Sequence, residues 1–344
     1  FAAVLRFSET ALWTSGYLAG GRPPVVRINP GIVYAVIGVS FAAALAMTIF
    51  INIKPFRAAQ SLISAFQATG EGNVRVVEER FRKALSLASG TIGAGEVREH
   101  LARIALSANA EQVQKNEDVK KFFEFSISEM EQEAAYWTGE NRDIKDNLVL
   151  GQLYSQFGSA TQNAGMLRKA FEQYKLASDF APSYIHIYPL LANAALMIGD
   201  ADSAVQGGMK IEELMYQAGK YDDILHNPAI IYAAVGQFDR SFQSLEKLKA
   251  ARGGQIDSLN HDMVAQAAKV ARNAAGQQSL GYVEKLFELD PVNKILKLVL
   301  AEMYGEIGRL NDARRLALSA LEQDPSLKPE VDNFLKALNG LSGQ

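Results

Sequence analysis

The sequence predicts an all-α protein in which a transmembrane helix is followed by a solenoid of helix-turn-helix repeats. Three observations support this prediction. Residues 31–51 carry no charged side chain. From residue 58 onward, small apolar residues, glycines and prolines recur at a fixed spacing, which is typical of a repeat array. No run of residues alternates apolar and polar side chains as a half-buried strand would.

Composition narrows the possible functions. The 344 residues allow one large domain or two ordinary ones, and an apolar content of 48% is enough for a packed core. The chain has no cysteine, which excludes disulfides, thiolate chemistry and cysteine-based zinc sites. Residues 1–57 contain five cations and one anion, a balance of +4, so the net charge of −3 leaves −7 for the remainder. An acidic remainder does not suit a nucleic-acid partner, and we expect none.

The uncharged stretch is predicted to be a transmembrane helix over residues 31–52. A helix of this length extends about 31 Å, the thickness of the hydrocarbon core of a bilayer. A secretory signal is a poor alternative to a transmembrane helix, because the apolar run is too long and begins too late in the chain. A helix buried in the core of the protein is a second alternative, and the sequence does not exclude it. Arg22 and Arg27 on one side balance Lys54 and Arg57 on the other, so the sequence does not define the orientation. Pro55 is expected to end the span.

Residues 1–30 are interpreted as an interfacial or partial membrane segment followed by a linker. Because the chain begins at Phe1, we expect it to be a fragment or a processed product. Within the span, Gly38, Ala42 and Ala46 follow one another at four-residue spacing. Such a stripe lets helix backbones approach closely, and it predicts contacts with other transmembrane helices.

Residues 58–344 are predicted to form about seven helix pairs closed by a capping helix. The clearest unit covers residues 294–325. Its first helix carries small and aromatic residues on one face, its second helix carries alanines at i, i+4 and i+7, and Pro325 closes it. The residues are Leu300, Ala301, Tyr304, Ala313, Ala317 and Ala320. This pattern resembles the tetratricopeptide repeat (TPR), except that Ala317 stands where the repeat prefers phenylalanine.

Other units repeat the pattern with departures. The unit that begins at Leu150, Gly151 and Tyr154 has about seven extra residues near 158–165, which we expect to form a loop. Gly208 stands where an aromatic residue is preferred. Residues 92–142 fit poorly but contain helical segments near 97–108 and 118–137. Residues 329–341 read as an amphipathic cap, because an open end of a repeat array would expose its core.

The search for chemistry gives no candidate catalytic residue, no metal site and no cofactor. None of the four histidines has a partner at the spacing of metal ligands, and no glycine-rich phosphate loop is present. Acidic residues are plentiful, but they are predicted to lie on solvated helix faces. Whether the chain belongs to an enzyme therefore stays open at this point.

A binding groove is predicted instead, lined by the first helix of each pair. The candidate residues follow the small residue of each unit or lie one turn away from it: Gln152, Ser155, Asn193, Leu196, His226, Ile230 and Glu302. Repeats that hold a peptide carboxylate use lysine and asparagine there, and no lysine matches Asn193. A protein or peptide with mixed polar and apolar side chains is the expected partner.

A second resemblance covers the end of the span. The sequence NIKPFRAAQSLISAF, residues 52–66, is similar to the segment after the last membrane span in bacterial O-antigen ligase-like proteins with repeat tails. The resemblance implies an integral protein of the bacterial inner membrane, with a glycan-transfer site upstream of this segment. The alternative is a membrane-tethered TPR adaptor without enzymatic activity, which would dock envelope or secretion assemblies. The reading frame before Phe1 distinguishes the two.

Overall fold

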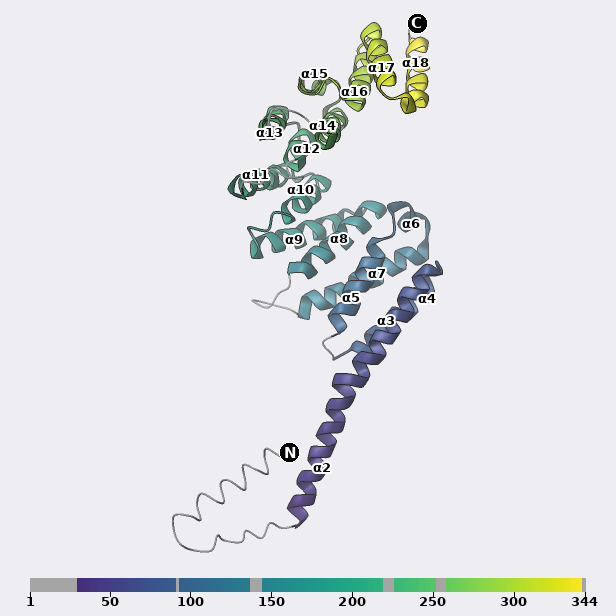
Figure 1. Ribbon diagram of the computed structural model, residues 1–344, viewed down its shortest axis with the longest axis vertical. Helices are drawn as coiled ribbons and strands as arrows, with labels where there is room; N and C mark the ends of the chain where they lie inside the picture. The colour runs from purple at the N-terminus through teal and green to yellow at the C-terminus, as the bar shows by residue number, and fades with distance from the viewer. Residues whose placement is uncertain (1–29, 91–92, 137–143, 219–225, 252–257, 342–344) are drawn as a thin grey trace. The chain divides into compact units, whose positions relative to one another are not determined.

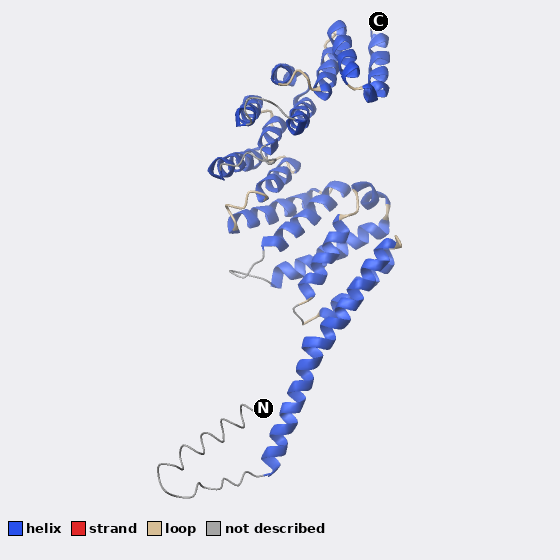
Figure 2. Cartoon of the chain, in the orientation of Figure 1, coloured by secondary structure: helices blue, strands red, loops and turns tan. Residues whose placement is uncertain are grey.

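The fold class expected from the sequence is confirmed: the protein is an all-α array of helix pairs. A computed structural model describes residues 30–90, 93–136, 144–218, 226–251 and 258–341. Within these ranges the regular elements are helices, and no strand occurs (Figure 2). The chain divides into two compact units, Phe1–Gln67 with Arg80–Ala94, and Ala68–Glu79 with Gly95–Gln344. The segment interpreted as interfacial, residues 1–29, lies outside the described residues.

The first unit contains one long, unbroken helical stretch (Figure 1). It begins with α2 (Pro30–Thr48), continues through a π-helical turn (Ile49–Ile53) and enters α3 (Lys54–Gly70). The helix therefore continues past Pro55, the residue expected to end the span, and the end of the span itself stays a prediction. In the π turn the Lys54 N–H donates to Ile49 O, five residues back, and such wider turns accommodate a residue that disrupts the α-helical ladder.

The membrane prediction concerns α2, which has the length and composition for a span. It contains 19 residues with a mean hydropathy of 2.0, and none of them is buried. A signal sequence near the N-terminus would meet the same two criteria. Among the described residues α2 is the one helix that could cross a membrane by length and composition; its membrane location remains a prediction.

The helix α3 pairs with α4 (Val74–Ala88) through a narrow apolar seam. Ser61 Oγ donates to Arg80 O at 3.3 Å, and the rings of Phe66 and Phe81 meet edge to face with centroids 6.3 Å apart. Phe81 and Ala65 are fully buried. The buried residues of α3 recur every three or four positions, as one helix face requires.

The second unit is a succession of antiparallel helix pairs. Its first pair, α5 (Ala94–Leu106) and α7 (Glu117–Tyr136), includes a short extra helix, α6 (Ala110–Lys115). This extra helix explains why the region fits the repeat poorly. The following pairs are α8 (Ile144–Thr161) with α9 (Ala164–Phe180), α10 (Ile187–Met197) with α11 (Ala201–Ala218), α12 (His226–Ala234) with α13 (Phe238–Ala251), α14 (Ser258–Ala275) with α15 (Leu280–Leu289), and α16 (Lys294–Glu306) with α17 (Leu310–Gln323).

The predicted loop near residues 158–165 is wrong, because the extra residues lengthen α8 instead. Gly158 lies inside the helix, where a Cβ atom would come 2.9 Å from Leu167 Cδ2. The glycine thus permits close packing against α9 and does not break α8. The helix ends at Thr161, and Gln162 directly after it has a positive φ of 54°. Asn163 then caps α9 by accepting from the N–H groups of Gly165 and Met166.

Small residues let aromatic rings enter the spaces between helices. A Cβ atom on Gly151 would lie 2.6 Å from the ring of Tyr174, and one on Gly208 would lie 3.0 Å from the ring of Tyr232. Both rings are almost completely buried. The glycine at 208 therefore replaces the expected aromatic residue because Tyr232, from the next pair, occupies that volume.

The predicted capping helix is present as α18 (Lys328–Leu341). Val331 and Leu338 are buried, while Phe334 and Leu335 pack against the same core cluster as α16 and α17. Gly305 of α16 faces Leu338 and Phe334 at ordinary contact distance. The cap thus covers the apolar end of the last pair.

Candidate functional site

The first helices of successive pairs lie beside one another, and we call the surface that they present the helix-A face. Packing between α10 and α12, between α12 and α14, and between α14 and α16 establishes this order. The predicted groove residues belong to these helices and to α8. The order of the helices therefore supports the prediction that the first helix of each pair lines the surface. The side chains at the predicted positions determine which contacts a partner could make.

The helix-A face is uncharged where α8 meets α10. Ser155 Oγ and Ser159 Oγ both donate to Met197 Sδ, at 3.7 and 3.5 Å. Met197 nevertheless keeps 49% of its surface exposed. Asn193, one turn earlier on α10, is exposed, and Leu196 is half-buried. The structure therefore brings Ser155 next to the predicted α10 positions, and it adds Met197, which the repeat pattern did not single out.

Other residues predicted to line the groove are less accessible to a partner or lie outside the described side chains. Gln152 is half-buried on α8, and Ile230 is half-buried on α12, where it packs against the core of the following pairs. His226 is the first residue of α12, and its side chain lies outside the described part of the chain. Gln156, which the repeat pattern did not predict, is tied to the backbone by an Nε2 hydrogen bond to Ala108 O.

Glu302 is brought into a charged cluster on α14 and α16. Arg272 donates to Glu302 and to Glu306, the latter at 2.5 Å. Burial opposes the charge of Arg272, yet its hydrogen bonds to the two carboxylates raise the pKa of this guanidinium. Because Arg272 neutralises one carboxylate, this cluster of three residues carries one net negative charge. No local spacing links residue 272 to 302, so the sequence could not have shown this pairing.

A second polar cluster fixes the turn before α16. His261 Nδ1 lies 2.7 Å from Asp290 Oδ2, and Asn293 Nδ2 donates both to that oxygen, at 2.8 Å, and to His261 O. Asn293 Oδ1 accepts from the Leu296 N–H and caps α16. The Asp290 side chain is 1% exposed. Its partners satisfy its acceptors, so the cluster has the character of a structural turn and offers no open site.

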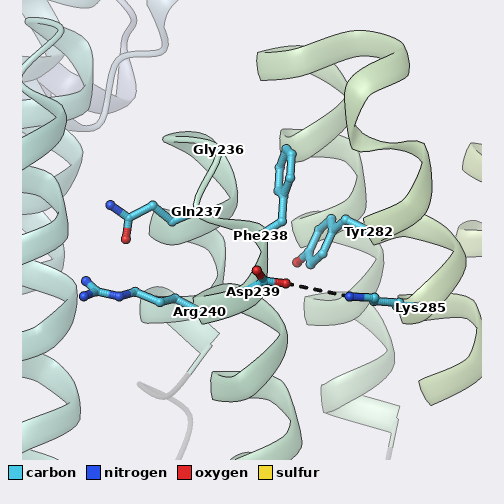
Figure 3. A pocket seen from close by; sticks show the side chains of 7 residues that line it. All are labelled: Gly236, Gln237, Phe238, Asp239, Arg240, Tyr282 and Lys285. Atoms are coloured by element: carbon cyan, nitrogen blue, oxygen red, sulfur yellow. Dashed lines mark ion pairs between the residues drawn. The ribbon is translucent and has the colours of Figure 1, made fainter.

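An open depression of about 460 Å³ lies beside α13 and α15 (Figure 3). The rings of Phe238 and Tyr282 stack with centroids 5.0 Å apart. Asp239 and Lys285 form an ion pair at 3.7 Å across the opening, whereas Arg240 points away from the rings. One face of each ring and the charges of Asp239 and Lys285 are thus already engaged within the protein.

The hydroxyl of Tyr282 is buried beneath that depression. Ser241 Oγ donates to Ala229 O at 2.7 Å, so its single proton is used and Tyr282 must donate to it, at 2.5 Å. Burial raises the pKa of Tyr282 to about 12. The tyrosine therefore stays protonated near neutral pH and holds α13 against α15.

The chemistry of these surfaces favours recognition of another molecule. Lys297 of α16 is almost buried, and burial lowers the pKa of its amine, but the amine donates to Ser319 Oγ inside its own helix pair. Among the described residues, no group of three His, Asp or Glu side chains is placed to hold a metal ion. Side chains from different repeats form one uncharged section and one charged section, as a surface for an extended partner would.

Helix pairs with adjacent first helices and a terminal cap define a helical-repeat protein. No protein-family profile matches the chain, and no curated protein does. Among solved structures, a tetratricopeptide repeat protein from Parabacteroides merdae is 13% identical, with 82% of this chain and 98% of that chain covered and a TM-score of 0.45.

Two further similar structures contain the same kind of repeat. The TPR domain of P58(IPK) is 15% identical, with 90% and 87% covered and a TM-score of 0.26. The TPR2AB domain of yeast Sti1, in a complex with pHSP90, is 14% identical, with 82% and 98% covered and a TM-score of 0.26. All three TM-scores are below 0.5, so the repeat assignment rests on the helix pairs and the repeat residues described above.

Proposed function

We propose that this protein is a membrane-anchored interaction protein whose helix-A face binds a segment of another protein. The observation that carries the proposal is the uncharged section of that face, where Ser155, Ser159, Asn193, Leu196 and Met197 come from two successive pairs. A partly exposed methionine beside hydroxyl and amide groups suits a partner with one apolar anchor and a polar backbone, because methionine adapts its shape at low cost.

The charged section extends this binding surface. Glu302 and Glu306 share Arg272, so these three residues together retain one net negative charge. A partner that crosses from α10 to α16 would therefore place a basic residue at its far end. Charge pairing at such an exposed site contributes specificity and faster association more than affinity.

The anchor in this proposal is α2. Its uncharged residues would extend about 28 Å, close to the 30 Å of a hydrocarbon core, and all of them are exposed in the folded chain. Lipid would remove this apolar surface from water. Carbonate extraction of membranes that contain the full chain tests the anchor, since a peripheral protein is released and a spanning one is retained.

Site-specific photo-crosslinking tests the binding face. A photoreactive residue at Asn193 is expected to capture a defined partner from native membranes, because this side chain is exposed on the uncharged section. The matched control is Lys175, which is exposed on α9, the second helix of its pair. Equal capture from both positions, or from neither, would contradict the proposal.

The wider context that we propose is an O-antigen ligase-like glycan transferase of the bacterial inner membrane, with this array as its interaction domain. The supporting observation is the amino-acid sequence of residues 52–66, which follow the C-terminal end of α2. A free-standing TPR adaptor is the alternative, and the same array would serve it. Several further hydrophobic spans in the reading frame upstream of Phe1 would favour the transferase, and a nearby start codon would favour the adaptor.

A further inference from the structure

The exposed face of α3, together with the last residue of the π turn before it, carries an apolar stripe that α4 does not cover. Ile53, Phe56 and Ile63 are 42%, 63% and 56% exposed. They lie at i, i+3 and i+10, with the exposed Gln60 at i+7, so all four share one side of the helix. The buried residues Ala58, Leu62 and Ala65 lie on the opposite side, toward α4.

Lipid does not reach the far end of this stripe, at Ile63, if α2 spans the bilayer. From Thr48, the end of α2, to Ile63 the chain advances 15 residues, or about 22 Å at the helical rise. The headgroup layer on each side of a bilayer is roughly 5–8 Å deep. The helix is continuous through the π turn (Figure 1), so Ile63 lies in water beyond the headgroups and needs a protein surface to cover it.

The spacing of the stripe is that of a coiled-coil seam. Ile53 and Gln60 are seven residues apart, as are Phe56 and Ile63, which places the first two at a positions and the other two at d positions. A shallow depression of about 510 Å³ is lined by Ile51, Ile53, Phe56, Arg57 and Gln60. This is the hollow on a helix surface into which a facing side chain inserts.

The charges on and beside the stripe indicate which kind of molecule would cover it. The four side chains of the stripe are uncharged, and among the residues that line the depression Arg57 alone could pair with an acidic partner or an anionic headgroup. In a parallel pair of α3 helices the flanking residue Arg57 occupies an e position, which faces a g position of the partner, so the two arginines do not meet each other. A polar residue at a single a position can specify the register and the oligomeric state of a coiled coil, and Gln60 occupies such a position here.

We propose that the Ile53–Phe56–Gln60–Ile63 stripe is the interface for a second copy of this chain, so that the protein forms a parallel dimer through α3. The position of the stripe in water rests on the proposed membrane anchor, whereas the pairing itself does not. The small residues Gly38, Ala42 and Ala46 lie on the same continuous helical stretch, and a Cβ atom on Gly38 would meet nothing within 4 Å. The dimer can therefore extend into the span.

The absence of cysteine makes the test direct, because a single introduced thiol reports on one position. The full chain with Gln60→Cys, in lipid nanodiscs, is expected to form a disulfide-linked dimer under mild oxidant. The matched control, Lys83→Cys, places the thiol at an exposed position on α4 and is expected to stay monomeric. Light scattering of the unmodified chain is expected to give the mass of a dimer.

Phe56→Gln with Ile63→Gln, added to the Gln60→Cys chain, removes the apolar contacts without touching the seam with α4. We expect the dimer dissociation constant to rise by roughly a hundredfold or more, because four apolar side chains leave the interface, while helicity is unchanged. A monomeric unmodified chain, or equal cross-linking at positions 60 and 83, would overturn the proposal. Carbonate extraction reports separately on the anchor, so a failed dimer and a failed membrane location are distinguishable.

Discussion

The helices α2 and α10 both lack charged residues, yet their side chains lie in opposite environments. In α10, Ile187, Ala192 and Ala195 are fully buried between neighbouring helices. In α2 none of the residues is buried. Apolar composition therefore predicts that the surface of a helix will be removed from water, but it does not show whether protein or lipid covers that surface. Length separates the two: α2 would reach about 28 Å and α10 only about 16 Å, too short for a bilayer.

The largest effect is expected from a charge placed in α10. Ala195 is fully buried, so Ala195→Asp would introduce a carboxylate with no partner among close-packed helices. We expect the free energy of unfolding of the array to fall by about 3–5 kcal/mol, the scale of an uncompensated buried charge. Urea unfolding followed by circular dichroism measures it. An unchanged midpoint would mean that α10 is not packed as described.

The matched change in α2 sharpens the comparison. Ala43→Asp adds the same charge to an exposed alanine, so we expect the unfolding of the array to be unaffected. Membrane insertion should instead become less favourable by about 2.5–3.5 kcal/mol, the cost of aspartate near the centre of a span. The fraction that resists carbonate extraction measures this effect. If this fraction stays the same, lipid is not what covers α2.

High pH tests the buried tyrosines of the array, which have no counterpart in α2. Burial raises the pKa of Tyr282 to about 12, and it also raises the pKa of Tyr174 and of Tyr232. A raised folded-state pKa means stability that is complete below the unfolded value of 10 and is lost as the pH rises toward 12. Between about pH 9 and about pH 11.5 we expect Tyr282 to account for a loss of roughly 2 kcal/mol.

The control for this prediction is Tyr282→Phe. It removes the hydrogen bond to Ser241 and should cost about 1 kcal/mol at neutral pH. Because phenylalanine does not ionise, the variant should lose less stability than the unmodified chain at high pH. The two unfolding curves should therefore approach each other as the pH rises. Parallel curves would show that Tyr282 ionises normally and is not buried.

Sequence reasoning found the helix pairs because local spacing defines them. Leu150, Gly151 and Tyr154 are neighbours on one helix face, and Pro325 ends a unit, so each signal lies within a few residues. The close approach of Gly151 to Tyr174 is also a property of one pair. The capping helix followed from the same argument, since an array with an open end would expose apolar residues.

What the sequence missed depends on contacts between distant residues. The spacing around Gly158 predicts a loop, but Leu167 fills the space beside this glycine and the helix continues. Arg272 pairs with Glu302 of the neighbouring repeat, and no rule of sequence spacing connects these two residues. Met197 differs from other apolar residues only because two serines approach its sulfur. The candidate face could thus be predicted helix by helix, whereas its division into uncharged and charged sections could not.

Among the changes made within the array, the smallest effect on stability is expected from Asn193→Ala combined with His226→Ala, on the surface proposed to bind a partner. Asn193 is exposed, and surface changes away from the core usually alter stability by less than about 0.5 kcal/mol, so the thermal midpoint should move by no more than a few degrees. Binding should weaken, because a partner loses an amide contact beside Met197 without any change in the fold. Affinity for a partner identified by crosslinking at position 193 measures this, with Lys175→Ala on α9 as the control. A partner that binds the double variant and the control equally well would show that the array presents its ligand site elsewhere or serves as a spacer.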